Sequence, residues 1–84
     1  MNREQIISII DELVIEFANE KVEELKGKNL VEDLGYDSVS LMQLIAELEE
    51  RLEISIEADA MLDSFDNYDN LVESVMELIN DGVQ

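Results

Sequence analysis

The sequence predicts an all-α fold, a small antiparallel four-helix bundle with three long helices and one short helix. Three segments repeat apolar residues at the spacing of an amphipathic helix, and no segment alternates apolar and polar residues at the period of a strand. The chain has 84 residues, so a single domain over residues 1–84 is expected. Proline is absent, and the three glycines lie between these segments or at their end.

The first helix is expected over about residues 3–19. Asn2 and Gln5 have the spacing of a capping box at its start. Its apolar residues at helical spacing are Ile6, Ile10, Leu13 and Phe17. The pattern continues through Val22 and Leu25, which allows an extension of the helix to that point.

An ordered loop is expected between the first two long helices. Residues 26–29 (Lys-Gly-Lys-Asn) break the helical pattern. Residues 30–37 combine the apolar residues Leu30, Val31 and Leu34 with acidic residues and a glycine. We expect these three apolar side chains to anchor the loop to the core.

The second helix is expected over about residues 38–52. Asp37 or Ser38 can cap its N-terminus, and Arg51 lies near the negative end of its dipole. At about 100° per residue, one face of this helix is continuously apolar. This core face consists of Leu41, Leu44, Ile45, Leu48 and Leu52.

The short helix and the last long helix are expected in the final third of the chain. Residues 57–63 contain enough apolar residues for one short helical turn. Asn67 or Asp69 can cap the last helix, which should end at residues 81–82. Its apolar residues at helical spacing are Tyr68, Leu71, Val72, Val75, Leu78 and Ile79.

The charge of the chain excludes several kinds of partner. Five basic residues stand against 22 acidic ones, a net charge of −17. Such a charge repels phosphate backbones and anionic lipids, so nucleic-acid binding is not expected and partners should carry basic patches. No apolar run can span a bilayer and no signal peptide is recognisable, so we expect a cytoplasmic monomer without membrane insertion.

The chain has no cysteine and no histidine, which removes most catalytic chemistry. Serine–histidine and cysteine–histidine nucleophiles, imidazole acid–base catalysis and most zinc sites all need one of these residues. The chain is therefore not expected to be an enzyme.

Four aspartates crowd the region before the last helix, namely Asp59, Asp63, Asp66 and Asp69. An EF-hand loop starting at Asp63 would have Phe65 and Tyr68 where an oxygen ligand and a glycine are required. No metal site is therefore expected.

A second apolar strip, formed by Val39, Met42 and Ala46, lies on the second helix away from its core face. Single exposed apolar residues are common, so the strip can be ordinary surface. An apolar strip bordered by carboxylates is more typical of a docking face for a basic partner. Residues 29–84 contain 15 acidic residues and one basic residue, a charge of −14, so most of the attracting charge lies beyond the first helix.

Ser38 lies where this strip begins, directly after Gly35, Tyr36 and Asp37. A serine at a helix start is most often a structural cap. The position also suits a phosphodiester, because unpaired amides and the positive end of the helix dipole stabilise an anion.

The segments 34–39 (Leu-Gly-Tyr-Asp-Ser-Val) and 44–50 (Leu-Ile-Ala-Glu-Leu-Glu-Glu) resemble the signature of the acyl and peptidyl carrier proteins. The similarity extends over nearly the whole chain. It implies a four-helix carrier domain of acyl-carrier type, in which Ser38 receives 4′-phosphopantetheine from coenzyme A through a phosphopantetheinyl transferase. The thiol of this group would hold acyl or aminoacyl intermediates as thioesters for loading and processing enzymes.

The resemblance also implies roles for other residues. Asp37 matches the acidic residue that precedes the modified serine. The implied partner-binding residues are Val39, Met42, Ala46, Glu47, Glu49 and Glu50.

Several positions depart from the carriers of fatty-acid synthesis. Val39 replaces a leucine and Gln43 a frequent glutamate. Arg51 replaces a commonly acidic residue, and Asn67-Tyr68 a threonine–valine pair. These differences favour a discrete carrier of polyketide or nonribosomal-peptide biosynthesis. The alternatives are a carrier of fatty-acid synthesis and, from another class, an unmodified acidic adaptor in which the serine is only a cap.

Core residues of the bundle can form an ordinary packed core or line a space for an acyl cargo, and helical spacing does not separate the two. The residues concerned are Leu41, Leu44, Ile45, Leu48, Val72, Val75 and Ile79.

Overall fold

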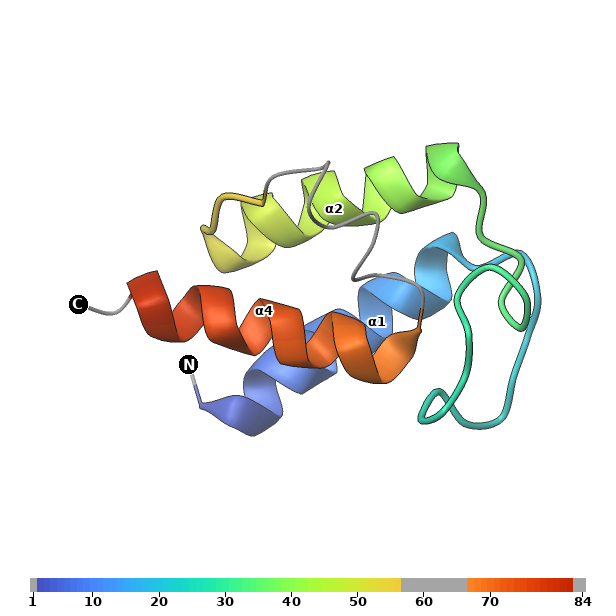
Figure 1. The fold of residues 1–84 in the computed structure, drawn as a ribbon, viewed down its shortest axis with the longest axis horizontal. Coiled ribbons are helices and arrows are strands. Elements are labelled where there is room, and N and C mark those ends of the chain that lie inside the picture. The colour runs from blue at the N-terminus through green and yellow to red at the C-terminus, as the bar shows by residue number, and fades with distance from the viewer. Residues whose placement is uncertain (1, 57–66, 83–84) are drawn as a thin grey trace.

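The computed structural model describes residues 2–56 and 67–82. Within these ranges the chain forms three α-helices, α1 (Arg3–Phe17), α2 (Ser38–Leu52) and α4 (Tyr68–Gly82). α1 runs in the opposite direction to α2 and α4, and the connection from α1 to α2 lies at the end of the molecule where α2 and α4 begin (Figure 1). The prediction of an all-α fold is confirmed. The short helix expected over residues 57–63 and three of the four clustered aspartates lie outside the described residues.

The start of α1 is fixed by the predicted capping box. The Asn2 side chain accepts the Gln5 amide at 2.8 Å, and the Gln5 side chain accepts the Asn2 amide at 3.0 Å. These two bonds satisfy donors that have no partner within the helix.

α1 ends before residue 19, so the extension through Val22 and Leu25 is wrong. The amides of Asn19 and Glu20 donate to the carbonyl of Leu34, at 2.9 and 3.1 Å, instead of to the preceding helical turn. Bonds to the loop therefore replace the next helical bonds. Val22 and Leu25 are nevertheless half-buried against the core. They are therefore apolar because they contact the core from the loop, not because the helix continues.

The loop between α1 and α2 is ordered and anchored to the core, as predicted, but by two of the three expected residues. Leu30 and Leu34 are buried, whereas Val31 is 54% exposed. The Asn29 side chain accepts the amides of Val31 and Glu32, at 2.9 and 2.8 Å. This side-chain cap turns Val31 away from the interior, a local geometry that hydrophobicity alone does not predict.

The core lies between the three helices and the loop. The predicted core face of α2 is buried over its whole length. The fully or almost fully buried core residues are Ile6, Ile10, Leu13, Val14, Leu30, Leu34, Tyr36, Leu41, Leu44, Ile45, Leu48, Leu52, Ile56, Tyr68, Leu71 and Val75.

The start of α4 is capped by Asn67, one of the two expected residues, whose side chain accepts the Asn70 amide at 2.8 Å. The other expected cap, Asp69, accepts the Gly27 amide at 2.8 Å instead. Asp69 therefore joins α4 to the loop between α1 and α2.

Candidate functional site

Ser38 is the first residue of α2, and its side chain is exposed. The N-cap of α2 is Asp37, whose carboxylate accepts the Ser40 amide at 2.8 Å and the Ser40 hydroxyl at 3.0 Å. The sequence left Asp37 and Ser38 as alternative caps. Because Asp37 performs this function, the Ser38 hydroxyl is not needed to cap the helix.

Asp37 places a negative charge directly before Ser38. The hydrogen bond from the Ser40 amide, followed by that from the Ser40 hydroxyl, lowers the pKa of Asp37 below its ordinary value. The sequence predicts unpaired amides at the start of this helix. For the Ser40 amide this prediction is wrong, because that amide already donates to Asp37. An anion on Ser38 would interact with the helix dipole but not with this amide.

The chain before Asp37 is held by contacts to α1 and to the loop. The buried Tyr36 hydroxyl donates to the Val14 carbonyl at 2.8 Å, and the Tyr36 amide donates to the Leu30 carbonyl at 2.9 Å. The Asn19 side-chain amide donates to the Gly35 carbonyl at 2.9 Å. Burial raises the pKa of Tyr36 above its ordinary value, so the hydroxyl keeps its proton and remains a donor.

Gly35 is required at its position for two reasons. Its φ of +71° lies in the left-handed region, and a Cβ there would lie 3.1 Å from the Cβ of Asn19. The close approach of the loop to the end of α1 thus depends on the missing side chain.

Sequence reasoning missed the structural roles of Tyr36, Asn19 and Ser40 around Ser38. The one available signal was the three-residue spacing of Asp37 and Ser40, which is typical of a helix N-terminus. The bonds of Tyr36 and Asn19 join residues that are distant in sequence, so no local pattern predicts them.

The apolar strip of α2 lies beside Ser38 and is exposed. Val39 is 64% and Met42 51% exposed, and Ala46 is also exposed. Together with Ser38 and Gln43 they line a shallow surface hollow of about 400 Å³. Gln43, one of the departures from the fatty-acid carriers, is thus part of the same surface.

The three acidic residues expected beside the strip differ in their surroundings. Glu50 is exposed, and Glu47 lies 4.0 Å from Arg51 in an ion pair. The half-buried Glu49 accepts the Ile56 amide at 2.9 Å. Glu49 therefore holds the chain after α2 in place, and its carboxylate is less available to a partner than that of Glu50.

Over residues 2–56 and 67–82, no group of three or more potential ligands could hold a metal ion. Of the helices described here, none has the length and apolar character needed to cross a membrane.

The family model described as "Phosphopantetheine attachment site" matches residues 8–75, which include Ser38 and the hollow beside it. An acyl carrier protein of Exiguobacterium sibiricum is 38% identical over 60 residues, covering 70% of this chain and 76% of the relative. An acyl carrier protein of another Exiguobacterium strain is 36% identical over 58 residues, covering 68% and 73%. An exposed serine at a helix start, not used as a cap, fits the attachment of such a group. The chain belongs to the phosphopantetheine-binding carrier family, and it is a non-catalytic carrier protein whose prosthetic group is 4′-phosphopantetheine.

Proposed function

We propose that Ser38 is the residue that receives the 4′-phosphopantetheine. The observation that carries this proposal is that Asp37 caps α2 and leaves the exposed Ser38 hydroxyl without a capping role. The adaptor alternative requires the serine to serve as the cap, so this geometry favours the carrier.

The residues around Ser38 hold the attachment point in a fixed position. Asp37 and Ser40 fix the chain on the helix side, while Tyr36 and Asn19 fix the loop that precedes it. When bound, the group supplies a thiol that carries acyl or aminoacyl cargo, which a chain without cysteine cannot supply itself. A rigid base with a flexible arm keeps the cargo at a high effective concentration for each partner enzyme.

The exposed strip of Val39, Met42 and Ala46 is the proposed contact surface for the transferase and for the loading and processing enzymes. Its apolar side chains can be buried by a partner, and the acidic residues beside it attract a basic patch. Glu47 and Glu50 are the proposed acidic contacts, with a smaller part for Glu49 because its carboxylate already bonds an amide.

The proposed pathway is polyketide or nonribosomal-peptide biosynthesis. In it, the chain is proposed to act as a single cytoplasmic, monomeric carrier domain. Val39, Gln43 and Arg51, which depart from the fatty-acid carriers, are all exposed on α2. These three therefore alter the surface offered to partners, whereas a further departure, Tyr68, lies in the core. Fatty-acid synthesis is the second candidate, because both relatives are named acyl carrier protein.

Mass spectrometry tests the attachment site. The wild type, incubated with coenzyme A and a broad-specificity phosphopantetheinyl transferase, should gain one phosphopantetheine. Ser38→Ala should gain none, and Ser55→Ala, which removes another exposed hydroxyl, should be modified like the wild type. A folded wild type that stays unmodified would favour the adaptor. The mass of the cargo on protein purified from its native cells separates the two pathways.

A further inference from the structure

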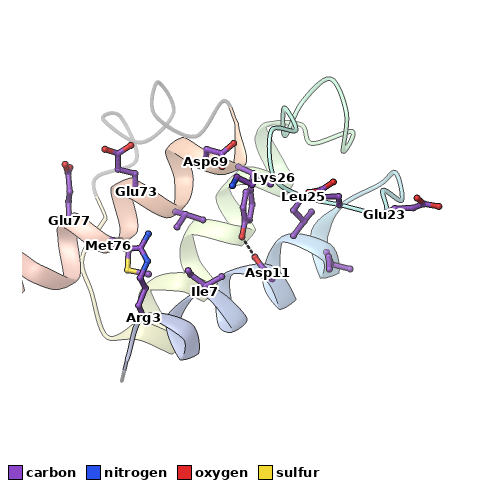
Figure 2. A pocket seen from close by; sticks show the side chains of 14 residues that line it. Arg3, Ile7, Asp11, Glu23, Leu25, Lys26, Asp69, Glu73, Met76 and Glu77 are labelled. Atoms are coloured by element: carbon purple, nitrogen blue, oxygen red, sulfur yellow. Dashed lines mark hydrogen bonds between the residues drawn. The ribbon is translucent and has the colours of Figure 1, made fainter.

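A groove of about 880 Å³ lies between α1 and α4, on elements that the proposed carrier function does not use (Figure 2). The segment before Gly27 closes one end of it, at Glu23 and Leu25, while Arg3 and Met76 lie toward the other end (Figure 2). The groove is open to solvent along its length, and its volume is that of a site for a sizeable ligand.

Apolar side chains from three segments line the groove. They are Ile7, Ile15, Leu25, Val72 and Met76. Ile15 is 62% exposed, although large aliphatic side chains are usually buried. The other four are half-buried, and because all five line the same groove they offer a partner more apolar surface than a single exposed residue does.

The charges along the groove are mainly negative. Among the described residues, six acidic and two basic ones line it, a net charge of −4. The acidic residues are Asp11, Glu23, Glu24, Asp69, Glu73 and Glu77, and the basic ones are Arg3 and Lys26. Figure 2 shows Glu73 and Glu77 following one another along α4. An apolar surface with an acidic border matches a partner that has an apolar stripe flanked by basic residues.

The groove is also built in advance. The Tyr68 hydroxyl donates a hydrogen bond to the Asp11 carboxylate, which joins α4 to α1 across the groove (Figure 2). A ligand can therefore enter without first separating the helices, which lowers the entropic cost of binding.

We propose that this groove is a second docking surface, which binds a cationic amphipathic helix of a partner protein. Such a helix would place its apolar face against Ile7, Ile15 and Val72 and its lysines or arginines beside the acidic border. A second copy of this chain, with a charge of −17, would be repelled, and so would nucleic acid and anionic membranes.

The two docking surfaces are separate. No residue of α2 lines the groove, and no residue of α1 or α4 lines the hollow beside Ser38. A partner helix in the groove thus leaves Ser38 accessible. The protein that supplies this helix and a processing enzyme at Ser38 can therefore be bound at the same time. The proposal does not depend on the modification of Ser38.

The test uses a synthetic helical peptide of leucine and lysine with one apolar face, and a scrambled peptide of the same composition. Nuclear magnetic resonance titration of the whole chain at about 0.15 M ionic strength limits long-range charge effects. We expect the largest amide shifts at Ile7, Ile15, Val72 and Met76, for the unmodified protein and for Ser38→Ala alike. The scrambled peptide should bind more weakly, because it has no continuous apolar face.

Two pairs of variants test whether the peptide binds in the groove. The first pair separates the charges of the groove from the general acidity of the chain. Glu73→Lys/Glu77→Lys should weaken binding by at least about fivefold, the effect of losing two exposed charge pairs. Glu32→Lys/Glu53→Lys makes the same change in net charge at exposed residues outside the groove and should weaken it by less than about twofold.

The second pair tests the apolar contact. Ile15→Ser should weaken binding by about threefold or more, whereas Val31→Ser, at a residue similarly exposed but outside the groove, should not. Equal effects within either pair, equal binding of the scrambled peptide, or shifts centred on Val39 and Met42 would each overturn the proposal. None of these results bears on whether Ser38 is modified, since that is measured by mass.

Discussion

Removal of the Tyr36 hydroxyl should destabilise the fold, because this group caps the end of α1. Tyr36 is 2% exposed, and its hydroxyl donates to the Val14 carbonyl at 2.8 Å. The carbonyls in the last turn of a helix have no partner within it. The Ala18 amide, which a longer helix would direct to Val14, bonds the Ile15 carbonyl instead.

The size of the effect follows from the burial of this carbonyl. Tyr36→Phe keeps the ring and its packing, so the change is almost confined to one hydrogen bond. A buried acceptor left without a donor costs about 1–3 kcal/mol. With about 2 kcal/mol as the central value, a domain of this size should lose about 8–16 °C in Tm.

Thermal and urea unfolding, followed by circular dichroism, measure this loss, and hydrogen exchange locates it. The amides of Asn19 and Glu20, which bond the Leu34 carbonyl, should exchange faster in Tyr36→Phe because the loop is held less firmly. Ser55→Ala removes an exposed hydroxyl and serves as the control.

A second readout is the dependence of stability on pH. The pKa of Tyr36 is raised in the folded protein by burial, so the unfolded chain releases this proton more readily. The stabilisation is complete below the usual pKa of tyrosine, about 10, and is lost as the pH rises above it. Tyr36→Phe should therefore lose less stability in alkali than the wild type. If its free energy of unfolding lay within about 0.5 kcal/mol of the wild type at neutral pH, the capping role of the hydroxyl would be refuted.

Four further substitutions, with Gly27→Ala as a control, test the surroundings of Ser38. Gly35→Ala should lower Tm more than Gly27→Ala: both residues have positive φ, which costs another residue about 1–2 kcal/mol, but only at Gly35 does the added Cβ meet a neighbour, at 3.1 Å. Asp37→Asn keeps a capping side chain without the charge. Because the pKa of Asp37 is lowered, its carboxylate stabilises the fold above the usual pKa of aspartate and this contribution is lost as the pH falls below it. The variant should therefore show a shallower loss of Tm in acid, and an unchanged acid limb would contradict the bond to Ser40. Val39→Asp and Met42→Glu should slow modification by the transferase by about threefold or more with unchanged helicity, since both side chains are exposed. Unchanged rates of modification and transfer would mean that the strip is ordinary surface.

The parts of the fold that depend on neighbouring residues could be predicted from the sequence. The capping box of Asn2 and Gln5 and the bounds of α2 involve residues three or four positions apart, and the structure confirms them. The core face of α2 also follows from helical spacing alone. The sequence context singles out Ser38 as the proposed attachment residue, but it does not identify the cap, because aspartate and serine are about equally good caps.

The parts that depend on distant residues could not be predicted. α1 ends where it does because the carbonyl of Leu34 attracts the amides of Asn19 and Glu20. Asp11 accepts the Tyr68 hydroxyl across the groove, a contact between residues 57 positions apart. The groove itself exists only when α1, the loop and α4 come together, so helical spacing on each separate element gives no sign of it.

Single carboxylates such as Asp37 and Glu49 stabilise the fold through hydrogen bonds, but the excess of negative charge over basic residues does not. The one ion pair among the side chains of residues 2–56 and 67–79 joins Arg51 to Glu47 at 4.0 Å. Both side chains are exposed, and such pairs contribute little. A net charge of −17 meanwhile opposes compaction. If the charge serves the recognition of partners, salt must have opposite effects on folding and on partner binding. Sodium chloride should raise Tm of the free protein by screening repulsion among carboxylates, and it should weaken the binding of basic partners by screening attraction. Differential scanning calorimetry and binding titrations over the same salt series measure both slopes. If Tm stayed flat while binding weakened, the carboxylates would be too well hydrated to strain the fold. If binding were insensitive to salt, recognition would rest on the apolar surfaces alone.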